Sequence, residues 1–479
     1  MIGKFLWGVA WRTMAFTGVV GAGLWYANRG PDWHGNALIE KNDTRLEGKA
    51  GVLVVALIQP GHFDPRFYHN FVDKIFTQII PWPINALAGT DTGIVLVDPD
   101  NPYQQTRYQP RRLVNIHGSE ADVDGIPWVE KFQRGQLRWE KPSTTTPHDF
   151  GFFLYPERKQ GMRTAAAKTI AKIKYIYYAR LPQGYLPHED QTRKMAQGAV
   201  DLVRQQHPIV GGEVVDAFDP WKKEQAVFRL LDAGADTIVL ASAQSLYSDF
   251  EELDGSFVAV HKAVEEWRAR HGGKPVKIVI PPYLAAQPEF EEMLLRHFAA
   301  SVPQASRPGQ SAMGILTFHG MPPSLLAHDS WTPRAAAFEA RLKPRIAEIL
   351  TAKGYAKVEA RFGSESFADQ MEDPDNKVVS VHELFEAARK AQTDVAVAVP
   401  IEFMAENTDS LFAHPSLIFD GYPGYQTYMG PPAGTDWSKP YVRQLTLGKT
   451  RVIYGGTMGG ADVGQQSKAL AAAIGRVFR

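Results

Sequence analysis

Between residues 226 and 399, helix-like segments alternate with short runs of apolar, β-branched residues. The runs at 237–241, 276–280, 314–318 and 395–399 predict strands, and the segments at 226–233, 258–271, 289–300 and 335–353 predict helices. An earlier apolar run, residues 51–61, predicts a further buried strand that ends in a Pro-Gly loop. Short, continuously apolar strands separated by helices are typical of parallel sheets that are covered on both faces. The sequence therefore predicts an α/β fold whose ligands bind beyond the carboxyl ends of the strands.

Two regions interrupt this alternation. Residues 87–162 contain short β-like pieces rich in Pro, Thr and Asp, with no long helix, which indicates a β-rich insertion peripheral to the core. From residue 419 onward, a loop rich in Gly, Pro and Tyr precedes a strand-like segment and a closing helix from about residue 464 to 478.

The amino-terminal thirty residues are apolar from position 5 to 27 apart from Arg12. A stretch of this length is able to span a bilayer, so we expect residues 1–29 to form a single membrane helix that is not cleaved. Lys4 and Arg12 outweigh Arg29, which favours an extracytoplasmic body. The alternatives are a cleaved signal peptide and an interfacial helix with the body in the cytoplasm.

Charge and cysteine content exclude several classes of site. Lys and Arg number 52, as do Asp and Glu, so the basic excess expected of a nucleic-acid-binding protein is absent. The chain has no Cys, which excludes disulfides, thiolate nucleophiles and an iron–sulfur cluster held by Cys. A metal would have to be bound by His, carboxylate or Tyr side chains.

Four motifs carry side chains suited to chemistry. His319 directly follows the predicted strand at 314–318 and precedes Gly320, so its ring is expected at the carboxyl edge of the sheet. Glu402, Glu406 and Asp409 are spaced to share one face of a helix, where they would act as a proton relay or a cation site. A solvated helix start is the alternative. The remaining two motifs are Arg361, an anion-binding candidate, and the polar segment 242–248 that follows a strand and is a candidate lining for a ligand site. The alternatives are an Arg in a surface strand that pairs with the neighbouring Glu, and hydroxyls that cap the next helix.

The order of these motifs resembles the ferrochelatase family, which inserts ferrous iron into protoporphyrin IX. Residues 51–61 (GVLVVALIQPG) resemble the family's first strand and loop, and TFHGMP (317–322) is similar to its Ser-Ala-His-Gly-Leu-Pro. EARFG (359–363) resembles Gln-Ser-Arg-Phe-Gly, and AVPIEFMAENTDSLF (398–412) resembles the segment that holds the family's catalytic Glu. Further likenesses fall at 71–87 and at 163–248, so the resemblance covers roughly residues 51–87 and 163–412.

The resemblance implies two similar, doubly wound parallel-sheet halves of the class II chelatase type. In that scheme residues 1–29 are the anchor, 30–86 the linker and start of half 1, 87–162 the insertion, 163–300 the rest of half 1, 301–418 half 2, and 419–479 a carboxyl-terminal extension.

The resemblance also implies site residues. His319 matches the family's catalytic His, Asp409 stands where the family has its Glu, and Glu406 matches an Asp three residues earlier. His319 and Asp409 would contact the metal. The expected substrate-binding residues are Tyr247, Ser248, Arg361, Phe318 and Met321. Asp409 is a shorter carboxylate than the family's, and the family's Gly-Ser-Pro-Leu motif is replaced by Pro-Gln-Gly-Tyr-Leu-Pro (182–187).

The sequence thus predicts a membrane-anchored, ferrochelatase-type lyase that inserts a metal, most simply Fe²⁺, into a tetrapyrrole, most simply protoporphyrin IX to give heme. Iron would be a substrate, with no permanently bound cofactor. Expected partners are the tetrapyrrole, the divalent metal, the membrane and a protein docked at residues 87–162, with no nucleic acid. Two alternatives stay open: a non-catalytic protein that binds a tetrapyrrole or metal, and a chelatase for another metal or ring.

Overall fold

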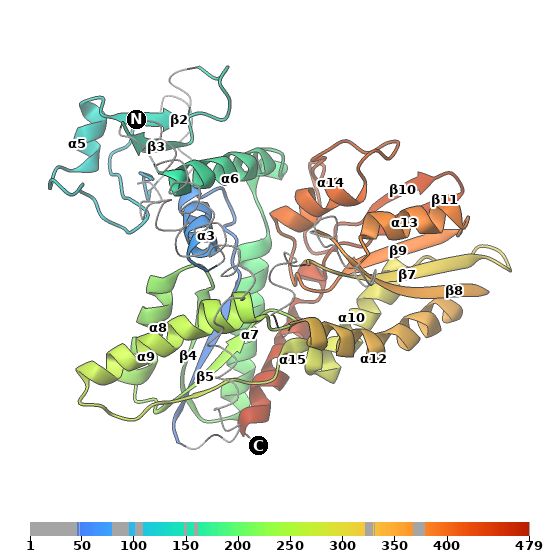
Figure 1. Ribbon diagram of the computed structural model, residues 1–479. Helices are drawn as coiled ribbons and strands as arrows, with labels where there is room; N and C mark the ends of the chain where they lie inside the picture. The colour runs from blue at the N-terminus through green and yellow to red at the C-terminus, as the bar shows by residue number, and fades with distance from the viewer. Residues whose placement is uncertain are drawn as a thin grey trace, which may run out of the picture.

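The fold is built around two mainly parallel sheets, as the computed structural model shows for residues 46, 48–78, 95–100, 109–147, 151–157, 161–320, 329, 331–366 and 379–478 (Figure 1). The first sheet has the order β4-β1-β5-β6 and is parallel throughout. Its strands are β1 (Ala50–Ala56), β4 (Ile209–Asp216), β5 (Thr237–Ser242) and β6 (Lys277–Val279).

The second sheet has the order β10-β11-β9-β7-β8, with an antiparallel edge strand, β10. Its strands are β7 (Ser311–Phe318), β8 (Lys357–Ser364), β9 (Val395–Pro400), β10 (Arg443–Leu447) and β11 (Thr450–Tyr454). The predicted α/β class with parallel sheets is confirmed. Because β11 pairs with β9, the segment after residue 419 extends the second sheet.

Helices cover the two sheets. Those associated with the first are α3 (Pro65–Gln78), α6 (Met162–Ala179), α7 (His188–Gln206), α8 (Pro220–Asp232) and α9 (Val258–Arg270). Those around the second are α10 (Pro288–Ser301), α12 (Trp331–Ala352), α13 (Val381–Lys390), α14 (His414–Ile418) and α15 (Val463–Gly475). Short helical segments are α5 (Trp128–Gln133), η1 (Pro182–Gly184), η2 (Asp249–Phe257), η3 (Leu284–Ala286), η5 (Asp409–Ala413), η6 (Gly459–Ala461) and η7 (Arg476–Phe478).

Local sequence explains where several helices begin. Asp219 caps α8 by accepting a hydrogen bond from the Lys222 backbone N–H at 3.0 Å. Ser380 and Glu383 form a reciprocal capping box at the start of α13. Strand β7 is pressed so closely against α10 and α12 that a Cβ on Gly314 would lie 2.6 Å from the Phe298 ring.

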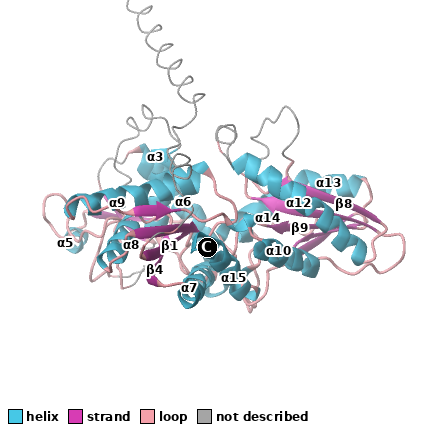
Figure 2. Ribbon diagram, turned by 90° about the horizontal axis from the view of Figure 1, so that it is seen from below, coloured by secondary structure: helices cyan, strands magenta, loops and turns pink. Residues whose placement is uncertain are grey.

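One hydrophobic core joins the two halves. It contains buried residues of β1, α7 and β5 together with residues of β7, α12 and β9. Helix α15 packs against both α7 and α10, and Figure 2 shows α7 and α15 lying between the two sheets. The carboxyl-terminal helix therefore fixes the second sheet relative to the first.

The insertion pairs β2 (Leu137–Glu140) with β3 (Phe153–Pro156) in an antiparallel sheet. Contrary to the expectation of a peripheral segment, it shares a buried aromatic cluster with α3 and α6. The Phe152 ring stacks on Tyr175 of α6 at 4.4 Å between centroids, and also contacts Phe63. The short strands of the insertion carry large aromatic side chains, and burial of these rings packs the insertion against half 1.

The prediction of a membrane-anchored protein is corrected. No helix within the described residues has both the length and the apolar character needed to cross a bilayer. Residues 1–29, on which that prediction depended, lie outside the described part of the chain.

Candidate functional site

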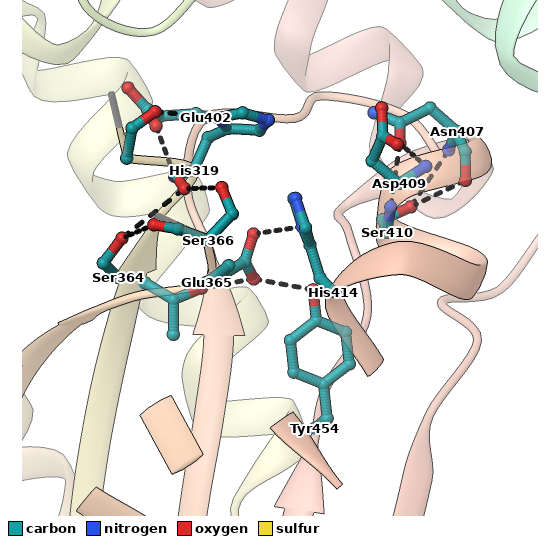
Figure 3. A network of polar contacts seen from close by, with 12 residues as sticks. His319, Ser364, Glu365, Ser366, Glu402, Asn407, Asp409, Ser410, His414 and Tyr454 are labelled. Atoms are coloured by element: carbon teal, nitrogen blue, oxygen red, sulfur yellow. Dashed lines mark hydrogen bonds and ion pairs between the residues drawn. The ribbon is translucent and has the colours of Figure 1, made fainter. Parts of the chain in front are cut away.

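His319 stands at the carboxyl end of the second sheet, directly after β7 (Figure 3). The next residue, Gly320, has φ +89°, and a Cβ there would lie 2.5 Å from the Ser366 carbonyl oxygen. The loop therefore requires glycine at this position. Nδ1 of His319 is 2.8 Å from the Gly320 carbonyl oxygen. In the tautomer in which Nδ1 donates to that oxygen, Nε2 carries the lone pair that a base or metal ligand needs.

Neighbouring side chains fix the backbone of His319. Glu402 accepts a hydrogen bond from its N–H, and the other carboxylate oxygen accepts one from Trp331 Nε1 at 2.7 Å. The Ser366 hydroxyl donates to the His319 carbonyl oxygen at 2.5 Å. The imidazole thus extends from a loop held on both sides, which favours a preorganised position for the ring.

A second imidazole, His414 of α14, faces His319. The ring centroids are 5.0 Å apart, and Phe403 contacts both rings. Nδ1 of His414 lies 2.8 Å from Oε2 of Glu365, and both side chains are almost fully buried. Neither atom makes a hydrogen bond of regular geometry, so the contact is a short electrostatic one.

The carboxylate that faces His414 is itself held in place. Its Oε1 accepts hydrogen bonds from Thr317 Oγ1 and Tyr454 hydroxyl, both at 2.6 Å. Glu365 therefore orients His414 through its Nδ1 atom, as a carboxylate commonly orients a functional His.

Asp409 lies at the start of η5 and is bound by a cation from the other half of the protein. Lys174 of α6 places Nζ 2.6 Å from Asp409 Oδ1 and 2.8 Å from Thr408 Oγ1. Burial alone would raise the pKa of Asp409, but Lys174, His414 and His319 outweigh burial and lower it to about 2. The carboxylate is therefore ionised at neutral pH, and its charge is felt by both imidazoles.

Glu406 belongs to a different network. It is 2 % exposed and accepts hydrogen bonds from Ser410 Oγ and from the Thr457 and Tyr441 backbone N–H groups. Burial raises its pKa, although these hydrogen bonds and Arg443 act in the opposite direction. Because its carboxylate is bound by these groups, Glu406 does not act as a partner of His319.

The expected helical face carrying Glu402, Glu406 and Asp409 is wrong, because residues 401–407 are not helical. Glu402 reaches the His319 loop, whereas Glu406 reaches loops after β10 and β11. Glu402 and Glu406 each accept hydrogen bonds from N–H groups in a different part of the chain, which one regular helix face would not allow.

Of the expected substrate-binding residues that the structure describes, Phe318 lies next to His319 and the others lie elsewhere. Tyr247 is buried in half 1, where its hydroxyl donates to the Pro281 carbonyl oxygen, and Ser248 donates to Glu252. Arg361 lies opposite Ile315 in mid-strand, exposed and paired with Glu359. Phe318, adjacent to His319, packs against Trp331 and Phe362. Met321 lies outside the described residues.

The residues of the site that were not identified from sequence include Glu365, His414 and Lys174. Glu365 directly follows strand β8, and that position was an available signal. His414 and Lys174 stand in helices and had none. Among the described residues, no group of three or more His, Asp or Glu side chains is arranged to hold a metal ion.

Comparisons with known proteins found matches among solved structures. No family model and no curated protein matches this chain. SirB from Bacillus subtilis with Fe³⁺ is 12% identical, with a TM-score of 0.33 over 60% of this chain and 90% of that chain. The sirohydrochlorin chelatase SirB from Bacillus subtilis subspecies spizizenii, in complex with cobalt, is 10% identical with a TM-score of 0.33, over 60% of this chain and 89% of that one.

A third match is DR2241 from Deinococcus radiodurans, a multi-domain protein described as structurally similar to chelatases. It is 13% identical with a TM-score of 0.29, over 60% of this chain and 51% of that one. Likenesses of this size carry no argument about activity.

Proposed function

We propose that this protein is a metal chelatase that inserts a divalent metal into a tetrapyrrole at the His319 site, most simply Fe²⁺ into protoporphyrin IX. The observation that carries the proposal is the pair of facing imidazoles, His319 and His414, with the ionised Asp409 close enough to affect both. Imidazole and carboxylate are suitable ligands for first-row divalent metals and suitable groups for proton transfer.

Metal insertion requires two events that these residues support. Two pyrrole N–H protons must leave the ring as the dication enters it. His319, with a lone pair on Nε2, accepts a pyrrole proton or donates that pair to the incoming metal. His414 provides a second nitrogen base, and Glu365 compensates its charge when it becomes protonated.

Asp409 has the role of stabilising positive charge in this scheme. Because its pKa is about 2, it stays anionic while a proton or a dication arrives. Phe403, in contact with both imidazoles, supplies an apolar surface suited to a flat macrocycle.

The Lys174–Asp409 ion pair favours one alternative. An ammonium group 2.6 Å from the carboxylate occupies one of the positions that a metal would use on Asp409. The second candidate function is therefore a protein that binds a tetrapyrrole without metallating it.

An anaerobic absorbance titration separates these functions. Purified protein is titrated with protoporphyrin, then with Fe²⁺ or Co²⁺, and the ring spectrum is followed; sirohydrochlorin is tested in the same way. A chelatase converts the free-base spectrum to that of the metallated ring faster than the metal and ring react alone. Ring binding with no acceleration supports the binding protein, and no ring binding rejects both.

A further inference from the structure

A cavity lies in half 1, and His319 is not among the residues that line it. Its volume is about 750 Å³, within the range of small-molecule sites. It lies at the carboxyl ends of β1 and β4, between α3, the start of α7, the first turns of α8 and residues 115–118 of the insertion. All the residues that line it belong to half 1 or to the insertion.

Lys223, on the first turns of α8, lines this cavity and is the most deeply buried of its basic residues whose side chains are described. It is 4 % exposed, whereas its neighbour Lys222 is exposed. Nζ of Lys223 donates a hydrogen bond to the Ala217 carbonyl oxygen at 2.6 Å, and no carboxylate lies within ion-pairing distance among the described residues. A buried ammonium without an ion-pair partner is costly, so this environment favours the neutral amine.

Most carboxylates that line the cavity are already engaged by other basic side chains. Asp219 is paired with Lys222, Asp64 with Arg66, and Glu189 with Arg193. Asp73 is paired with Arg163. The fifth carboxylate that lines the cavity is Asp216, which accepts a hydrogen bond from the Phe218 N–H.

A second lysine, Lys74 of α3, lines the same cavity and opposes protonation of Lys223. Burial, followed by Lys74, lowers the pKa of Lys223 to about 7, although Asp216 and Asp219 act against this. Burial likewise raises the pKa of Asp216 to about 6. A desolvated lysine beside another cation is an arrangement that activates an amine as a nucleophile.

We propose that Lys223 is a nucleophilic amine that condenses with an aldehyde or ketone bound in this cavity, giving an imine. The Nζ lone pair forms a bond to the carbonyl carbon, and the carbonyl oxygen leaves as water. The two amine protons go to that water, so the step needs neither an oxidant nor a reductant. Asp216, which lines the same cavity, is placed to supply and recover a proton as the water departs.

The test is reductive trapping with propanal as the probe. The full-length protein is treated with propanal and cyanoborohydride, which reduces any imine to a stable secondary amine, and the modified lysines are quantified by peptide mass spectrometry. At pH 7 an amine with a pKa near 7 has a neutral fraction roughly 10³ times that of an ordinary lysine. We expect Lys223 to be labelled at least ~10-fold faster than Lys222 in the same molecules.

Variants give matched controls. Lys222→Arg should leave the fast adduct unchanged, and Lys223→Arg should remove it without altering labelling elsewhere. Lys74→Met should move the midpoint of the pH–labelling curve of Lys223 to higher pH. Because Lys223 and Lys222 are compared within the wild-type chain, the test does not depend on a variant folding. Labelling of Lys223 at or below the rate of Lys222 would overturn the proposal, and an unchanged curve in Lys74→Met would overturn the role of Lys74.

Discussion

Replacement of Lys174 by Met tests how half 1 controls the candidate site in half 2. Lys174 and Asp409 have side chains that are 13% and 25% exposed, so their 2.6 Å ion pair is largely shielded from water. Removing one member of a buried pair leaves an uncompensated charge, which costs about 3–5 kcal/mol when burial is complete. His414 and His319 still lie close enough to stabilise Asp409, so we expect Lys174→Met to lower the free energy of unfolding by less than this, about 2–3 kcal/mol at pH 7.

The pH dependence of this effect has a definite sign. The pKa of Asp409 is lowered from 3.8 to about 2, so the pair contributes stability above the unfolded pKa and loses it as pH falls toward 2. The wild type and Lys174→Met should therefore differ most above about pH 4 and converge at lower pH. Removing the lysine also removes the largest of the charges that oppose the effect of burial, so the pKa of Asp409 should rise.

Urea-induced unfolding followed by tryptophan fluorescence measures the difference, from pH 3 to 7. Lys172→Met is the matched control, because Lys172 is on the same helix and shares its partner Glu140 with Lys168. It should cost less than about 1 kcal/mol. Lys174→Met combined with Asp409→Asn should be less destabilised than the sum of the single variants. A fully additive double variant, or a Lys174→Met protein as stable as the wild type, would refute this reasoning.

Three further changes test other parts of the structure. His188 is buried, accepts a hydrogen bond from the Gln59 N–H, and has a pKa lowered to about 4 by burial. Because the unfolded chain binds this proton first, His188 alone should lower the free energy of unfolding by about 3 kcal/mol from pH 6.5 to 4. His188→Asn should remove that part of the pH dependence, while His69, with a similar pKa, keeps a part of about the same size. Phe152→Ala should lower the free energy of unfolding by about 3–5 kcal/mol, because it opens a cavity between the insertion and α6. Val123→Ala, at a site 95% exposed, should be neutral. Equal unfolding midpoints for the two variants would show that the insertion is peripheral. Asp409→Asn should lower the rate of metal insertion more than it weakens tetrapyrrole binding. Asp409→Glu should leave the turnover of a working chelatase unchanged or lower it. A gain of turnover in Asp409→Glu would instead indicate that the wild-type site has lost its activity.

The α/β class was predictable because each buried strand carries its own signal. Residues 237–241, 314–318 and 395–399 are apolar on both faces and are bounded by helices or Pro, and the structure places β5, β7 and β9 there. His319 was predictable for the same reason, since a residue directly after a buried parallel strand must lie at the carboxyl edge of the sheet.

Contacts between distant segments were not predictable. Lys174 meets Asp409 across 235 positions of sequence, and no local pattern on α6 distinguishes it from Lys172. The helical spacing of Glu402, Glu406 and Asp409 was misleading because residues 401–407 form a loop, where distant N–H groups bind Glu402 and Glu406, whereas Asp409 begins η5 and pairs with Lys174. The insertion was predicted to be peripheral because its strands are short, whereas its burial depends on aromatic partners in α3 and α6.

The central claim is that His319 moves protons or metal during insertion, and single-turnover metallation tests it most directly. Protein preloaded with protoporphyrin is mixed anaerobically with Fe²⁺, and the rate of the spectral change is compared between the wild type and His319→Ala, with the dissociation constant of the ring measured separately. The account predicts a rate lower by ~10²-fold or more in His319→Ala, with ring binding nearly unchanged. Equal rates in the two proteins, or a wild type no faster than protein-free solution, would contradict it.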